Sequence, residues 1–128
     1  MNNAKFDVTA IGNAIVDVIA QADDDLLAAH KLPKGAMNLI DAEMAEKLYS
    51  IMGPGKEASG GSAGNTIAGI AMLGGKTAYI GKVADDQLGS IFTHDIRAAG
   101  VTYDTRPLVG GFPTARSIGS SVMESLYA

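Results

Sequence analysis

Short apolar runs and apolar residues at helical spacing alternate along this chain. The short runs predict strands over residues 6–11, 14–20, 36–40 and 77–82, with extended chain again at 101–103. Apolar residues at helical spacing predict helices over residues 26–30, 41–52, 63–73 and 87–99. Strands that alternate with helices in this way are typical of a layered α/β fold with a largely parallel sheet.

Aspartates stand where most of these helices begin. A carboxylate at a helix start accepts hydrogen bonds from N–H groups that have no partner within the helix, and the helix dipole favours its charge. We therefore expect Asp41, Asp85 and Asp86 to be helix caps, and the acidic run at 23–25 to interact favourably with the dipole of the first helix.

The helix predicted over 63–73 begins differently, at two glycines within Ser59-Gly60-Gly61-Ser62-Ala63-Gly64-Asn65-Thr66. Adjacent glycines let the backbone approach a ligand where a Cβ would collide, and the polar residues after them supply a helix start with unpaired N–H groups. The same small residues would also let the helix pack closely against a sheet. Spacing alone does not separate these two interpretations.

Asp17 is a single carboxylate within the apolar run at 14–20, shortly after Gly12-Asn13. A carboxylate is costly to bury without a partner, so its position suggests a strand end facing a cleft, where it could accept hydrogen bonds from ligand hydroxyls. The alternative is an exposed charge on an edge strand. The sequence leaves both interpretations open.

Composition excludes several classes of function. With 128 residues, of which 47% are hydrophobic, the chain can bury one core. Its net charge of −4, with lysines and arginines scattered singly, argues against nucleic acid as a partner. It has no cysteine, which excludes disulfides and Cys-based zinc sites. Since no apolar segment resembles a signal peptide or a membrane span, we expect a cytoplasmic protein that does not bind a membrane.

Three motifs follow one another in the first part of the chain. They are Gly12-Asn13 with Asp17, then Gly60-Gly61-Ser62-Ala63-Gly64-Asn65, then Gly81-Lys82-Val83-Ala84-Asp85-Asp86 with Gly89. Together they resemble the N-terminal part of the ribokinase-like, or pfkB, family of carbohydrate and nucleoside kinases. Residues 34–41 and 81–89 are most similar to bacterial adenosine-kinase-like members. The resemblance covers about residues 5–117, with departures from the family's usual small residues at Ile67 and Ala84.

The resemblance implies a three-layer α/β fold with a mainly parallel central sheet and a small β lid. Residues 1–117 would be the N-terminal portion of such a domain, with lid segments at about 14–20, 36–40 and 112–117, and residues 118–128 would be a divergent tail. The implied activity is ATP-dependent phosphate transfer to a hydroxyl of a sugar or nucleoside, with adenosine favoured. Complete members use ATP and Mg²⁺ for this reaction.

The resemblance also implies an acceptor site. Asp17 would accept hydrogen bonds from sugar hydroxyls, Asn65 would donate to the same ring, and Asn13 would orient these groups. Lid residues would cover the ligand. The full implied set of substrate-binding residues is Asn13, Asp17, Met37, Leu39, Gly60, Gly61, Ser62 and Asn65.

In this family, phosphate transfer depends on a Gly-Ala-Gly-Asp segment whose aspartate activates the acceptor hydroxyl, and this sequence lacks it. We therefore assign no catalytic or metal-binding residue, and expect the 128 residues alone to be inactive and to bind neither ATP nor Mg²⁺ tightly. Exposed lid or sheet edges would favour homo-oligomers.

Two alternatives to a kinase remain open. One is a protein that only binds a sugar or nucleoside, or that pairs with another chain through its lid. The other is a dinucleotide-binding domain. The last would require a strand-borne G-x-G-x-x-G with an acid about 20 residues later, and no such arrangement is found.

Overall fold

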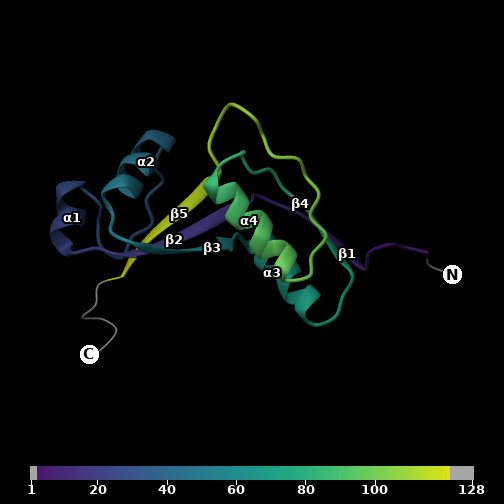
Figure 1. The fold of residues 1–128 in the computed structure, drawn as a ribbon. Coiled ribbons are helices and arrows are strands. Elements are labelled where there is room, and N and C mark those ends of the chain that lie inside the picture. The colour runs from purple at the N-terminus through teal and green to yellow at the C-terminus, as the bar shows by residue number, and fades with distance from the viewer. Residues whose placement is uncertain (1–2, 122–128) are drawn as a thin grey trace. The chain divides into compact units, whose positions relative to one another are not determined.

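The computed structural model describes residues 3–121, in which strands and helices follow one another in the order β-β-α-α-β-α-β-α-β (Figure 1). In order, the elements are β1 (Val8–Ile11), β2 (Ile15–Gln21), α1 (Asp24–Ala29), α2 (Ala42–Ile51), β3 (Gly55–Gly60), α3 (Ser62–Met72), β4 (Thr77–Ile80), α4 (Gln87–Ala98) and β5 (Ala115–Ser121). β5 runs through residue 117, and the rest of the predicted tail, 122–128, lies outside the described residues.

The chain forms two compact units. The first comprises Met1–Asp17 and Glu57–Ser117, and the second comprises Val18–Lys56 and Ile118–Ala128. The division falls within β2, β3 and β5, so each of these strands contributes residues to both units.

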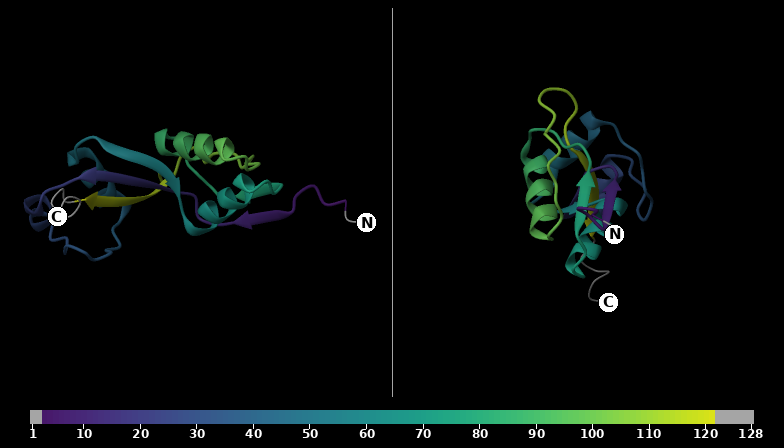
Figure 2. Two further views of the ribbon diagram at one scale, coloured as in Figure 1. Left: turned by 90° about the horizontal axis from the view of Figure 1, so that it is seen from below. Right: turned by 90° about the vertical axis from the view of Figure 1, so that its right-hand side faces the viewer.

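A parallel sheet lies in the first unit. β1 and β4 pair in parallel, with Val8 opposite Thr77 and Ile11 opposite Ile80, and Figure 2 shows the two strands side by side. A further parallel bridge joins Ala78 to Thr102, in the segment predicted to be extended. α3 packs against both strands. The parallel sheet is therefore confirmed here, although β4 ends at Ile80, two residues before the predicted end.

Three aromatic rings form the core of the first unit. Tyr79 on β4, Phe92 on α4 and Tyr103 are each at most 2% exposed, and their ring centroids lie 5.6–5.9 Å apart. Phe92 and Ile96 are four residues apart on α4 and both buried, which is the helical spacing that the sequence indicated. Full burial of each such side chain contributes about 1.5–3 kcal/mol to stability. This cluster fixes α4 against the sheet.

The second sheet has the strand order β3-β2-β5, with β2 in the middle. Along β2, Val16, Val18 and Ala20 are buried, and the alternate residues are less so. β3 was not predicted from the sequence. Its first residues follow Gly53-Pro54 and are polar, Lys56 and Glu57 among them, so no apolar run marks this strand.

The predicted strand over residues 36–40 is wrong. These residues have no ladder partner in the described part of the chain, and Met37 and Leu39 are 91% and 96% exposed. An apolar run becomes a strand only where a neighbouring strand accepts its hydrogen bonds and its side chains are buried. Neither condition holds for this segment.

The helix caps agree with the sequence in part. Asp41 accepts from the Met44 N–H at 2.8 Å, as expected, and Asp23 caps α1 through the Leu26 N–H. At α4 the cap is Asp86, whose side chain accepts the Gly89 N–H, while the backbone N–H of Asp85 donates to the carbonyl of Leu108. α3 has Gly61 at its N-cap, with no side-chain hydrogen bond.

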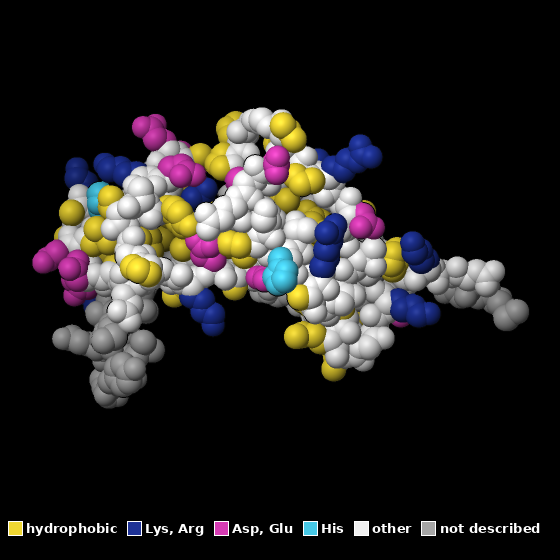
Figure 3. Space-filling model, viewed as in Figure 1, with side chains coloured by type: hydrophobic (Ala, Val, Ile, Leu, Met, Phe, Trp, Pro, Cys, Tyr) yellow, Lys and Arg dark blue, Asp and Glu magenta, His cyan; other side chains and the backbone are white. Residues whose placement is uncertain are grey.

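Hydrophobic side chains interrupt the polar surface on the face drawn in Figure 3. In the parallel sheet, Ile11 is 76% exposed and Ile80 is 49% exposed. β1 has β4 as its strand partner within residues 3–121, which leaves its other edge unpaired among them. None of the helices in residues 3–121 has the length and apolar character needed to cross a bilayer.

Candidate acceptor-binding site

Asp17 lies against the backbone of Gly60. A Cβ built on Gly60 would stand 2.8 Å from the carboxyl carbon of Asp17 and within contact of both carboxylate oxygens. β2 is the central strand of its sheet and Asp17 is only partly exposed, so the edge-strand interpretation does not describe it. The Asp17 carboxylate thus occupies the space that a side chain at position 60 would need, and glycine, which has no side chain, fits there.

Gly61 and Asn13 meet beside this contact. The Asn13 carbonyl oxygen lies 2.9 Å from the position that a Cβ on Gly61 would take, and Gly61 has a φ of 89°. Glycine adopts this backbone conformation without the strain that a side chain would cause. The Gly12-Asn13 turn is thus packed directly onto the start of α3.

The first turn of α3 presents backbone donors at the same place. The first N–H groups of a helix have no partner within it, and at α3 the N-cap residue Gly61 supplies no side-chain acceptor for them. Ser62 and Asn65 are exposed, and Thr66 donates its hydroxyl back to the Ser62 carbonyl at 2.7 Å. Carboxylate acceptors beside helix-start donors form an arrangement that can hydrogen-bond a polyhydroxyl ligand.

The structure brings together most of the residues predicted for the acceptor site, but not all of them. The six that belong to the first unit are Asn13, Asp17, Gly60, Gly61, Ser62 and Asn65. Met37 and Leu39 belong to the second unit, where both are almost fully exposed.

Asp95 supports the site in a way that sequence reasoning missed. Its Oδ2 accepts a hydrogen bond from the backbone N–H of Ser59 at 2.8 Å, joining α4 to the strand residue just before Gly60. The two residues are 36 positions apart, and an aspartate within an amphipathic helix gives no sequence signal of such a contact.

Asp86 links the start of α4 to the chain before β5. It accepts the Gly89 N–H at 2.8 Å, the Thr114 N–H at 2.9 Å and the Thr114 hydroxyl at 2.6 Å. Burial acts to raise the pKa of Asp86, but the hydrogen bonds from Thr114 and Gly89 and the charge of Arg116 outweigh it and lower the pKa below its usual value. The carboxylate is therefore ionised while it holds the two segments together.

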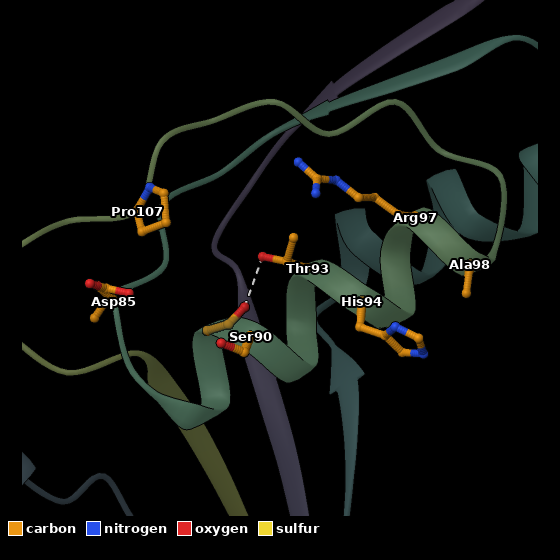
Figure 4. Close-up of a pocket in the computed structure, with 9 residues that line it drawn as sticks. Asp85, Ser90, Thr93, His94, Arg97, Ala98 and Pro107 are labelled. Carbon is orange, nitrogen blue, oxygen red and sulfur yellow. Dashed lines mark hydrogen bonds between the residues drawn. The ribbon is translucent and has the colours of Figure 1, made fainter.

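A separate groove of about 610 Å³ is lined by residues of α4 and of the segments before and after it (Figure 4). Asp85, His94, Arg97 and Pro107 are among its lining residues, and none of the residues predicted for the acceptor site lines it. Arg97 donates twice to the carbonyl of Tyr103, at 2.9 and 2.8 Å. Its guanidinium thus holds the neighbouring loop in place.

Within the part of the chain that the structure describes, no group of three or more His, Cys, Asp or Glu side chains could hold a metal ion. The Gly-Ala-Gly-Asp segment is not in the sequence.

Comparisons with known proteins agree with the fold and the motifs. Residues 5–117 match the family described as pfkB family carbohydrate kinase. Adenosine kinase from Sinorhizobium meliloti is 68% identical, with a TM-score of 0.76 over 90% of this chain. A probable sugar kinase from Rhizobium etli is 64% identical, with a TM-score of 0.75 over 89% of this chain. The 5-dehydro-2-deoxygluconokinase of Lacticaseibacillus casei is 34% identical over 94% of this chain.

The chain spans about a third of the length of these relatives. It covers 35% of the Sinorhizobium enzyme, 34% of the Rhizobium protein and 29% of the Lacticaseibacillus enzyme. The ribokinase-like resemblance found in the sequence is confirmed over this part.

Proposed function

Because the chain belongs to the pfkB family of carbohydrate kinases, we propose that it carries the acceptor-binding part of an ATP-dependent phosphotransferase that acts on a sugar or nucleoside hydroxyl. The observation that carries this proposal is the contact between the Asp17 carboxylate and the Gly60 backbone, beside the uncapped start of α3. One charged acceptor and several backbone donors at one place suit a ligand with neighbouring hydroxyl groups.

Adenosine is the acceptor that we favour. The support is the 68% identity to the Sinorhizobium adenosine kinase over 90% of this chain. The 64% identical protein is described as a probable sugar kinase, so a free sugar is the second candidate.

In this proposal Asp17 accepts hydrogen bonds from two hydroxyls of the acceptor, and Asn65 donates to the same ring. Asn13 orients the groups around them, the backbone at Gly60 and Gly61 lies against the ring, and Ser62 adds a polar group at the helix start. Met37 and Leu39 cover the bound acceptor. The 128 residues by themselves bind the acceptor and transfer no phosphate, because the sequence has no Gly-Ala-Gly-Asp segment.

The test is acceptor binding by the 128-residue chain, measured by isothermal titration calorimetry with adenosine, D-ribose and D-fructose. Asp17→Asn keeps the side-chain volume and replaces a charged acceptor oxygen with a donor. Charge-assisted hydrogen bonds contribute about 1.5–3 kcal/mol, so affinity should fall roughly tenfold to a hundredfold or more. Asp25→Asn, at an exposed position in α1, is the matched control and should bind as the wild type does.

Two results would contradict the proposal. One is a wild-type chain that binds none of the three compounds, and the other is an Asp17→Asn variant that binds with unchanged affinity. A phosphate-transfer assay with ATP and adenosine completes the test, and transfer by the chain alone would overturn the expectation of inactivity.

A further inference from the structure

Tyr79 has a buried hydroxyl that makes no hydrogen bond. The residue is 2% exposed, and its Oη has no partner among the residues that the structure describes. Burial raises the pKa of Tyr79, so the group stays a neutral donor. Phenylalanine would fill the same space without leaving a polar atom unpaired, which makes the hydroxyl costly in this arrangement.

Tyr103 provides the contrast within the same aromatic cluster. Its hydroxyl is also buried, but it donates to the carbonyl oxygen of Gly81 at 2.7 Å. The ring centroids of Tyr79 and Tyr103 are 5.9 Å apart. The two neighbouring tyrosines thus differ in whether the hydroxyl has a hydrogen-bond partner.

The Tyr79 hydroxyl points to the junction of the Gly12-Asn13 turn with the first turn of α3. It lies 3.3 Å from the position that a Cβ on Gly12 would take, and the Cβ of Ala63 lies 2.7 Å from the same position. An unpaired, buried donor is therefore aimed at a helix start that has no side-chain cap.

The carbonyl oxygen of Gly12 lies close to the ring of Tyr79. It lies 2.8 Å from the position of a Cβ on Gly81, and the Tyr79 Cζ, which carries the hydroxyl, lies 2.9 Å from that same position. Among residues 3–121, no backbone N–H outside the helices and strands donates to this carbonyl. A movement of the turn that brings the Gly12 carbonyl toward the Tyr79 hydroxyl would let the two form a hydrogen bond.

Such a movement would also shift the candidate site. Gly12 precedes Asn13, whose carbonyl packs onto Gly61, so the turn cannot move without changing where Asn13 stands relative to the start of α3. A ligand that favours one position of the turn would then favour the Tyr79 hydrogen bond as well.

We propose that Tyr79 is a positioning residue for acceptor binding, whose hydroxyl donates to the Gly12 carbonyl when the Gly12-Asn13 turn closes on the acceptor. The inference rests on the proposed function, because the ligand that closes the turn is the sugar or nucleoside. The hydroxyl acts on the ligand only through the turn.

The experiment compares Tyr79→Phe with Tyr103→Phe in the 128-residue chain. Tyr79→Phe should leave the thermal midpoint unchanged or raise it, and should weaken adenosine binding about three- to tenfold, the worth of one net hydrogen bond. Tyr103→Phe should lower the thermal midpoint, because it leaves the Gly81 carbonyl unpaired, and should bind adenosine as the wild type does. If Tyr79 had a purely structural role, any loss of affinity in Tyr79→Phe would come together with a loss of stability.

The carbonyl carbon of Gly12 gives a direct signature by NMR. Adenosine should shift its ¹³C resonance in the wild type, as a carbonyl that gains a hydrogen bond does, and the shift should be smaller in Tyr79→Phe. Equal affinity and equal shifts in the two proteins would overturn the inference and leave the proposed function standing. A wild-type chain that binds neither adenosine, D-ribose nor D-fructose would overturn both.

Discussion

Asp86 and Thr114 are joined by two hydrogen bonds, in which the backbone N–H and the hydroxyl of Thr114 donate to the two carboxylate oxygens of Asp86. The Thr114 hydroxyl in turn accepts the backbone N–H of Ala84 at 2.9 Å, and Thr114 is 3% exposed. A helix cap thus also anchors a segment 28 residues later in the chain.

This contact predicts a pH-dependent loss of stability. Because the hydrogen bonds and Arg116 lower the pKa of Asp86 from its usual 3.8, its contribution is complete above that value and is lost as the pH falls through the lower folded-state pKa. Thermal unfolding between pH 2 and pH 6 should therefore show Asp86→Asn as less stable than the wild type near pH 6. The difference should shrink toward pH 2, and a constant difference over the whole range would contradict the assignment.

The contact between Asp17 and Gly60 predicts opposite effects of alanine at two glycines. In Gly60→Ala the new methyl group would overlap the carboxylate, so stability should fall by about 1–3 kcal/mol and adenosine binding should weaken. Gly69→Ala is the control, because nothing lies within 4 Å of its Cβ position in α3 and alanine there should stabilise by about 0.5–1 kcal/mol. Denaturant titration and calorimetry measure both quantities. Equal stabilities of the two variants would refute the contact.

Asp95 is expected to hold β3 in place for acceptor binding. In Asp95→Ala the part-buried Ser59 N–H loses its partner, at a cost of about 1–3 kcal/mol. Hydrogen exchange should be faster at the Ser59 amide than in the wild type. His94→Ala changes the exposed neighbouring position of α4 and should leave this amide unaffected. Unchanged protection of Ser59 in the Asp95 variant would show that the hydrogen bond does not hold the strand.

The uncovered strand edge predicts self-association. β1 is paired on one side within residues 3–121, and Ile11 at its end is 76% exposed. Unpaired edges and exposed apolar side chains favour pairing with another chain, so light scattering after gel filtration should detect oligomers. Ile11→Lys should reduce their amount, whereas Met37→Lys, at a residue 91% exposed in the second unit, should have less effect. A monomer that unfolds cooperatively in dilute solution would be evidence against this expectation.

Local sequence signals were sufficient for β1, α3, β4 and α4 of the first unit. The helix after the paired glycines was predicted over 63–73 and is found at Ser62–Met72, and the cap at Asp86 was predicted with the last helix. These features depend on residues close together in the chain, such as a glycine that frees the backbone or a carboxylate that reaches an N–H three positions away. The family, too, could be identified from three ordered motifs.

Features that depend on distant partners could not be predicted in this way. The segment 36–40 has the composition of a strand without a partner strand, whereas β3 is polar and becomes a strand because it pairs with β2. The sequence also left open whether Asp17 lies on an edge strand, and the central place of β2 excludes that interpretation. Hydrogen bonds from Ser59 to Asp95 and from Thr114 to Asp86 span 36 and 28 residues. The amino-acid sequence determines which residues can donate, accept or approach closely, but only the folded chain decides which of them meet, because that depends on the packing of the whole unit.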